Sequence, residues 1–109
     1  MQQYSFGAIV LLAFPFSNSM GAKRRPALVL LDTGDQDIVV ARVTSQAVRS
    51  PFDVNIVAWQ QAGLLLASIV RVDKLATLEK RLIERQMGSL NDDDRNRVRA
   101  ALQQLWNSM

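Results

Sequence analysis

A polar stretch that ends in three adjacent cations is the first part of the sequence that could bind an anion. It reads Ser17-Asn18-Ser19-Met20-Gly21-Ala22-Lys23-Arg24-Arg25-Pro26. A guanidinium group matches the geometry of a phosphoryl group, and loops on a rigid scaffold often carry binding groups. We expect a loop here between two strands. Its cations either bind phosphates or form an ordinary solvated basic loop.

Two further sets of polar residues lie in or at the ends of predicted strands. Thr44 and Ser45 carry hydroxyl groups that could hydrogen-bond a phosphate or could begin a turn. Arg71 and Asp73 are two positions apart, and such residues project from the same side of a strand. They could form a structural ion pair. They could also be a catalytic pair, in which the carboxylate accepts a proton and the guanidinium neutralises charge.

The composition excludes several kinds of chemistry. The 109 residues include no cysteine and no histidine, which excludes disulfides, Cys/His zinc sites, thiol nucleophiles and histidine-based catalysis. Helix capping explains the run Asp92-Asp93-Asp94 better than metal binding does, so we expect no metal site and no cofactor. The net charge of +3, from 13 basic and 10 acidic residues, fits an anionic partner.

The strands that must position these residues are indicated by short apolar runs between turn residues. The predicted strands are 9–13, 27–31, 38–43, 53–57 and 68–72, with a short edge strand at 87–90. Such continuous runs are typical of strands buried on both faces. The turn Asp32-Thr33-Gly34-Asp35 predicts a hairpin between the second and third strands. A second short helix is expected at 79–85.

The C-terminal segment changes to a helical period. Val98, Ala101, Leu102 and Leu105 fall on one helix face, and Asn91 is the predicted N-cap. Trp106 is expected to continue this apolar face, and the leucines at 64–66 with Trp59 are expected in the core or in a dimer contact. We expect one domain, residues 1–109, in which the helix packs on a mostly antiparallel barrel or rolled sheet.

A membrane segment is not expected. The apolar run 8–14 is far shorter than the roughly 20 residues of a spanning helix. The residues at 1–5 lack the positive charges of a signal peptide. The predicted location is therefore the cytoplasm.

Taken in order, these pieces resemble the MazF/PemK family of toxin endoribonucleases, which are mRNA interferases. The similarity is strongest at Lys23-Arg24-Arg25-Pro26-Ala27-Leu28-Val29-Leu30, close to the basic-Arg-Pro-hydrophobic signature of that family. It also covers 7–11, 14–16, 43–45, 68–74 and 88–90. The resemblance therefore spans nearly the whole chain in the right order.

The resemblance implies a mainly β fold with a C-terminal helix, the SH3-like β-barrel shared by MazF, PemK and CcdB toxins. It also implies a homodimer with a groove for single-stranded RNA. Cleavage would need no metal: the RNA 2′-hydroxyl attacks the adjacent phosphate and leaves a 2′,3′-cyclic phosphate and a 5′-hydroxyl end. A cognate antitoxin would insert an acidic, partly disordered segment into the groove.

By position, the resemblance assigns catalysis to four residues: Arg25, Thr44, Arg71 and Asp73. The arginines would stabilise phosphate charge, because a guanidinium is always protonated and is a poor base. Asp73 is the candidate base, and Thr44 with Ser45 would bind a phosphate oxygen. The residues expected to contact RNA bases and backbone are Ser17, Asn18, Lys23, Arg24, Ser45, Gln46 and Arg49.

One position departs from the family pattern. Family members commonly carry an acidic residue directly after the first glycine, where this chain has Ala8. The alternatives to an active ribonuclease are a decayed toxin, a gyrase-poisoning toxin that binds a protein, and a general nucleic-acid binder. The four predicted catalytic residues favour the enzyme, because a pure binder would not need them.

Overall fold

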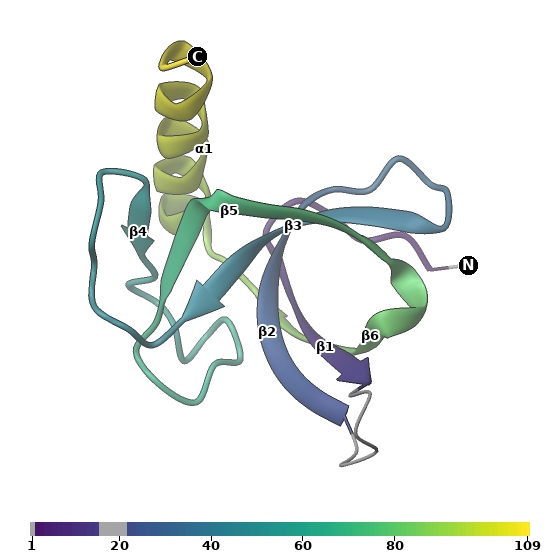
Figure 1. Ribbon diagram of the computed structural model, residues 1–109. Helices are drawn as coiled ribbons and strands as arrows, with labels where there is room; N and C mark the ends of the chain where they lie inside the picture. Colours follow the sequence, from purple (N-terminus) through teal and green to yellow (C-terminus); the bar gives the residue numbers. More distant parts are fainter. Residues whose placement is uncertain (1, 16–21) are drawn as a thin grey trace.

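The structure is a computed structural model that describes residues 2–15 and 22–109 (Figure 1). In this part of the chain, six strands form one antiparallel sheet in the order β4-β5-β3-β2-β1-β6. A 3-10 turn joins β5 to β6, and a helix follows the sheet. The elements are β1 (Ala8–Pro15), β2 (Ala22–Leu31), β3 (Asp37–Thr44), β4 (Asp53–Asn55), β5 (Ile69–Glu79), η1 (Lys80–Leu82), β6 (Ile83–Ser89) and α1 (Asp92–Asn107).

The strongly curved sheet carries an apolar core on each face (Figure 1). Neighbouring residues on a strand point to opposite faces. Ile9 and Leu28 therefore pack in the core that α1 covers, whereas Val10 and Val29 pack in the core inside the curl. We call these the helix-side core and the inner core. Burial on both faces confirms the interpretation of the continuous apolar runs.

The sheet is curled but not closed. β4 pairs only with β5 and β6 only with β1, so the described strands leave two edges. The mainly β fold with a C-terminal helix is confirmed, while the closed barrel is not. The hairpin between β2 and β3 is confirmed as well.

Three predicted elements are wrong in detail. The cations at 23–25 lie in β2 and not in a loop, because their backbones pair with residues 12–14 of β1. The strand predicted at 68–72 continues to Glu79. The helix predicted at 79–85 is only the turn η1 followed by β6, because Leu82 and Ile83 pack against the inner core and β6 pairs with β1.

The C-terminal helix begins where the sequence predicts. The Asn91 side chain accepts the backbone N–H of Asp94 at 2.8 Å, which confirms the N-cap. Asp94 is itself buried, and its carboxylate accepts the backbone N–H groups of Val57 and Ala58, both at 3.0 Å. Trp106 is 71% exposed, so the apolar face ends before it, contrary to expectation.

Within the described residues, no helix is both long and apolar enough to cross a membrane.

Candidate functional site

A hollow of about 300 Å³ lies beside β2 and the end of β3 and brings together several predicted site residues. Its polar wall contains Arg24, Arg25, Thr44 and Ser45. The strand register explains this meeting. Ala27 lies opposite Arg42, and the same register continued by two residues places Arg25 opposite Thr44. Side chains of such cross-strand pairs are close neighbours.

The other wall of this first hollow is apolar and comes from residues 64–66 with Met87. Two glycines fix this wall. Gly63 has a φ of +86°, and a Cβ on it would lie 2.2 Å from the Met87 carbonyl oxygen. A Cβ on Gly88 would lie 2.5 Å from the carbonyl oxygen of Ala62. The loop backbone therefore packs directly on β6, a close approach that a larger residue at either position would obstruct.

Leu64 is buried by this packing, but Leu65 and Leu66 are 87% and 62% exposed at the rim. Of the two places expected for the three leucines, core or dimer contact, the core is confirmed for Leu64 alone. Trp59 is partly buried against the helix-side core, as expected.

The hydroxyl of Thr44 has a local role as well as a position in the hollow. Its oxygen accepts the backbone N–H of Gln46 at 3.2 Å, so the predicted turn is present. A hydroxyl has one hydrogen to donate and two lone pairs. Because Thr44 Oγ1 is an acceptor here, its hydrogen can be donated to an oxygen of a bound phosphate.

A second hollow, of about 460 Å³, adjoins the first and combines an apolar lining with four cations. Lys23, Arg25, Arg42 and Lys74 surround it, and Arg25 lines both hollows. Arg42 and Lys74 were not predicted as site residues. Arg42 lies two positions before Thr44, which is a signal in the sequence that both point to one face. Lys74 carried no such signal, because only the sheet order places β5 beside β3.

A third, small hollow of about 110 Å³ contains the other predicted catalytic residues, Arg71 and Asp73. Arg49 and Lys74 also line it, and Lys74 is shared with the second hollow. Neighbouring hollows therefore share cations, Arg25 between the first and second and Lys74 between the second and third. We call the cations that line the three hollows the basic strip: Lys23, Arg24, Arg25, Arg42, Arg49 and Lys74.

The structure does not pair Arg71 with Asp73. The Arg71 guanidinium is buried and bonds Asp53 at 2.5 Å, whereas Asp73 is exposed. The reason is a bulge in β5. Arg71 lies opposite Arg42 and Leu75 lies opposite Ala41, so residues 72–74 have no partners in the ladder and the alternation of faces is interrupted.

The carboxylate of Asp53 stays ionised beneath the surface. Burial acts to raise its pKa, but the backbone N–H of Arg49 and the Arg71 guanidinium outweigh burial and lower the pKa below its ordinary value. Arg71 and Asp53 therefore form a buried, charged pair.

The remaining predicted residues lie in different surroundings. Arg24 is exposed and bonds Glu84 at 2.7 Å, a hydrogen bond that raises the pKa of Arg24 and lowers that of Glu84. Lys23 is exposed. The Gln46 side chain accepts a hydrogen bond from Arg71, and the Arg49 backbone donates one to Asp53. Ser17 and Asn18 lie outside the described residues.

Ala8, the departure from the family pattern, is buried in the inner core and lines none of the three hollows. The described residues also contain no group of three or more acidic side chains that could hold a metal ion.

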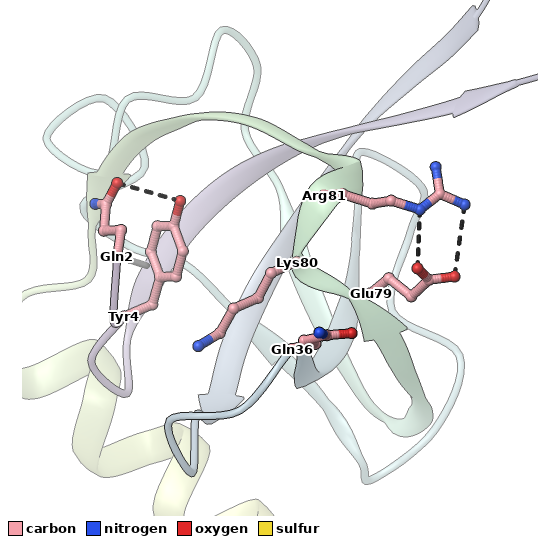
Figure 2. Close-up of a pocket in the computed structure, with 6 residues that line it drawn as sticks. All are labelled: Gln2, Tyr4, Gln36, Glu79, Lys80 and Arg81. Atoms are coloured by element: carbon pink, nitrogen blue, oxygen red, sulfur yellow. Dashed lines mark hydrogen bonds and ion pairs between the residues drawn. The ribbon is translucent and has the colours of Figure 1, made fainter.

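A separate hollow of about 390 Å³ lies beyond the other end of the inner core and is lined by Gln2, Tyr4, Gln36, Glu79, Lys80 and Arg81 (Figure 2). The buried Lys80 ammonium bonds Asp32 at 2.7 Å. Arg81 bonds Glu79 at 2.8 Å, as the dashed lines in Figure 2 show. No predicted site residue lines this hollow, so it is not part of the candidate site.

Several solved structures share this fold. A MazE–MazF complex from Deinococcus radiodurans is 27% identical, with 97% of this chain and 98% of that chain covered and a TM-score of 0.77. The Mycobacterium tuberculosis toxin MazF-mt6 is 20% identical, with 92% and 96% covered and a TM-score of 0.75. An endoribonuclease in complex with its cognate antitoxin, from a mycobacterial species, is 20% identical, with 95% of each chain covered and a TM-score of 0.71.

No curated protein sequence matches the chain. A family model described as "PemK-like, MazF-like toxin of type II toxin-antitoxin system" matches residues 5–106, nearly the whole length. The chain therefore belongs to the PemK-like, MazF-like toxin family of type II toxin–antitoxin systems.

Proposed function

We propose that the protein is a toxin endoribonuclease that cleaves single-stranded RNA without a metal ion. The observation that carries the proposal is the first hollow, where Arg25, Thr44 and Ser45 meet at the edge of the basic strip. A guanidinium and two hydroxyls can surround one phosphate, and the strip can hold the phosphates on either side. Relatives with the same fold are named endoribonucleases, which supports the same class of activity.

In the proposed reaction, the RNA supplies its own nucleophile. The 2′-hydroxyl loses its proton and attacks the adjacent phosphorus, the bond to the 5′-oxygen breaks, and that oxygen takes up a proton. The products carry a 2′,3′-cyclic phosphate and a 5′-hydroxyl. Arg25 stabilises the charge that builds up on the phosphate, and Thr44 and Ser45 donate hydrogen bonds to its oxygens. No histidine is needed for these steps.

Asp73 is the base in this proposal, on the strength of the family resemblance. It is exposed and lines the third hollow, whereas Arg25 and Thr44 line the first. A general base must lie within hydrogen-bond reach of the proton that it removes, so the proposal requires bound RNA to bring Asp73 and the 2′-hydroxyl together. Arg71 would have to break its bond to Asp53 to reach a phosphate, so we assign it a positioning role. Of the two interpretations of Arg71, the geometry favours a structural ion pair, with Asp53 in place of Asp73.

The proposed partners follow from the same surface. An acidic antitoxin segment would lie along the basic strip and exclude RNA from it. The related Deinococcus radiodurans toxin has been crystallised with MazE, which supports a partner of this kind. The proposal includes a homodimer, and Leu65 and Leu66 at the rim of the first hollow are exposed apolar residues that a second copy could cover.

The test is incubation with a long single-stranded RNA of mixed sequence in EDTA, followed by mapping of the product ends. The wild type should give discrete cuts with 5′-hydroxyl ends, and Arg25→Ala should lose roughly 10²-fold or more in rate. Arg81→Ala is the matched control, because Arg81 is also an exposed arginine and lies in the separate hollow. Uncut RNA with a folded wild type, bound in a salt-dependent way, would support the nucleic-acid-binding alternative instead.

A further inference from the structure

The buried Arg71 side chain contacts the segment that follows Thr44. Its Nη1 donates to Asp53 Oδ2 at 2.5 Å. Its Nη2 donates to the side-chain oxygen of Gln46 at 3.2 Å and to the backbone carbonyl of Ala47 at 3.4 Å. One rigid guanidinium therefore joins β5 to the beginning of segment 45–52 and to its far end at β4.

Asp53 holds the same segment at another point. The carboxylate oxygen that binds Arg71 also accepts the backbone N–H of Arg49 at 2.8 Å. The backbone N–H of Asp53 donates to the Ser50 carbonyl at 3.1 Å, which closes the end of the segment. The side chains of Asp53 and Arg71 are 1% and 2% exposed, so water does not compete for these bonds.

Gln46 links this buried pair to the first hollow. Its side chain accepts from Arg71, while its backbone N–H donates to the hydroxyl oxygen of Thr44. Gln46 and Arg49 are exposed, so the segment presents polar groups to solvent beside the basic strip. A movement of the segment would therefore change the Thr44 hydroxyl and the exposed groups together.

We propose that Asp53 and Arg71 are positioning residues whose buried pair fixes segment 45–52 and so determines which RNA bases are accepted beside Thr44. This inference rests on the proposed function. Burying two charges is costly, and a well-attested use of such a pair is to select one arrangement of the chain. Neither residue contacts RNA in this proposal, and both act through Gln46, Ala47 and Arg49.

The chain offers a matched control in its second buried ion pair. Asp32 and Lys80 bond at 2.7 Å, with side chains 0% and 7% exposed, at the other end of the inner core. Asp32→Asn should therefore cost stability much as Asp53→Asn does, without touching segment 45–52. Arg71→Lys is the second variant. It keeps a cation for Asp53 but lacks the second nitrogen that reaches Gln46 and Ala47.

Two measurements test the proposal. Hydrogen exchange with mass spectrometry measures the protection of the backbone amides of segment 45–52 in the absence of RNA. Sequencing of the cleavage ends gives the sequence preference, and kinetics on a short preferred RNA give kcat and KM. We expect Asp53→Asn and Arg71→Lys to speed exchange in the segment about tenfold, to raise KM more than they lower kcat, and to broaden the cleaved sequences. Asp32→Asn should change none of these.

The outcomes separate this proposal from the proposed function. If Arg71→Lys lowers kcat while exchange and sequence preference stay at wild-type levels, Arg71 is catalytic and the positioning role is wrong. The proposal is also wrong if Asp32→Asn speeds hydrogen exchange in segment 45–52 as much as Asp53→Asn does. It is wrong as well if the amides at 46–49 of the wild type exchange without protection. Arg71→Lys decides the matter if Asp53→Asn does not fold. A wild type that cuts no RNA refutes the proposed function, whereas the exchange data still test the pair.

Discussion

The side chain of Thr44 contributes one hydroxyl group. Its oxygen accepts a hydrogen bond from the backbone N–H of Gln46, so its hydrogen is available for donation to a phosphate. Thr44→Val keeps the shape of the side chain and removes the hydroxyl, so we expect kcat to fall about 10²-fold. Thr44→Ser keeps the hydroxyl and should retain most of the activity. Single-turnover cleavage of a short RNA measures both, with urea midpoints as the control for folding. If Thr44→Val cuts RNA at the wild-type rate, Thr44 has no catalytic role and only stabilises the turn that follows β3.

At the scale of single residues, the sequence predicts positions better than it predicts partners. The family resemblance groups Arg25 with Thr44, but their meeting depends on β2 beginning at Ala22, and the sequence pattern places residues 22–26 in a loop. The partner of Arg71 could not be found from the sequence. Alternation along a strand points to Asp73, and only the bulge at 72–74 and the pairing of β4 with β5 bring Asp53 to the guanidinium.

At the scale of elements, Asp94 joins the helix to the loop that follows β4. Its carboxylate satisfies the backbone N–H groups of Val57 and Ala58. Asp94→Ala leaves both of these donors without their partner, and we expect a loss of roughly 2–4 kcal/mol in the free energy of unfolding. Asp93→Ala is the matched control in the same helical turn. Asp93 is exposed, so its loss should cost no more than about 1 kcal/mol. Urea unfolding followed by tryptophan fluorescence gives both values, and similar costs for the two variants would contradict the link.

Predictability differs among elements for a physical reason. The capped helix and the hairpin between β2 and β3 are specified by residues close in sequence, and both were predicted. β6 was predicted only in its last residues, because the residues before them were assigned to a short helix at 79–85. Its strand forms through pairing with β1, more than 70 residues earlier in the chain. Likewise, a rolled sheet was expected. Whether the sheet closes into a barrel depends on pairing between its edge strands, β4 and β6, and residues close in sequence do not specify that pairing.

At the scale of the whole molecule, a buried ion pair stands at each end of the structure, Asp53–Arg71 beside the candidate site and Asp32–Lys80 at the other end. The hydrogen bond from Lys80 is the largest of the effects that lower the pKa of Asp32, and the pKa of Asp53 is lowered as well. In the unfolded chain both carboxyls titrate near pH 3.9. The folded state therefore binds fewer protons than the unfolded state as the pH approaches that value.

A carboxyl with a lowered folded pKa stabilises the protein fully above its unfolded pKa, and this stabilisation is lost as the pH falls toward the folded pKa. We therefore expect the free energy of unfolding to be nearly constant between about pH 5.5 and 8, where a chain without histidine has few groups to titrate, and to fall steadily below about pH 5. The double variant Asp32→Asn/Asp53→Asn should be less stable at neutral pH and should lose less on acidification. Urea unfolding at a series of pH values from 3 to 8 measures both slopes. If the double variant declines as steeply as the wild type, other carboxyls, such as the exposed Glu84 beside Arg24, control the acid response.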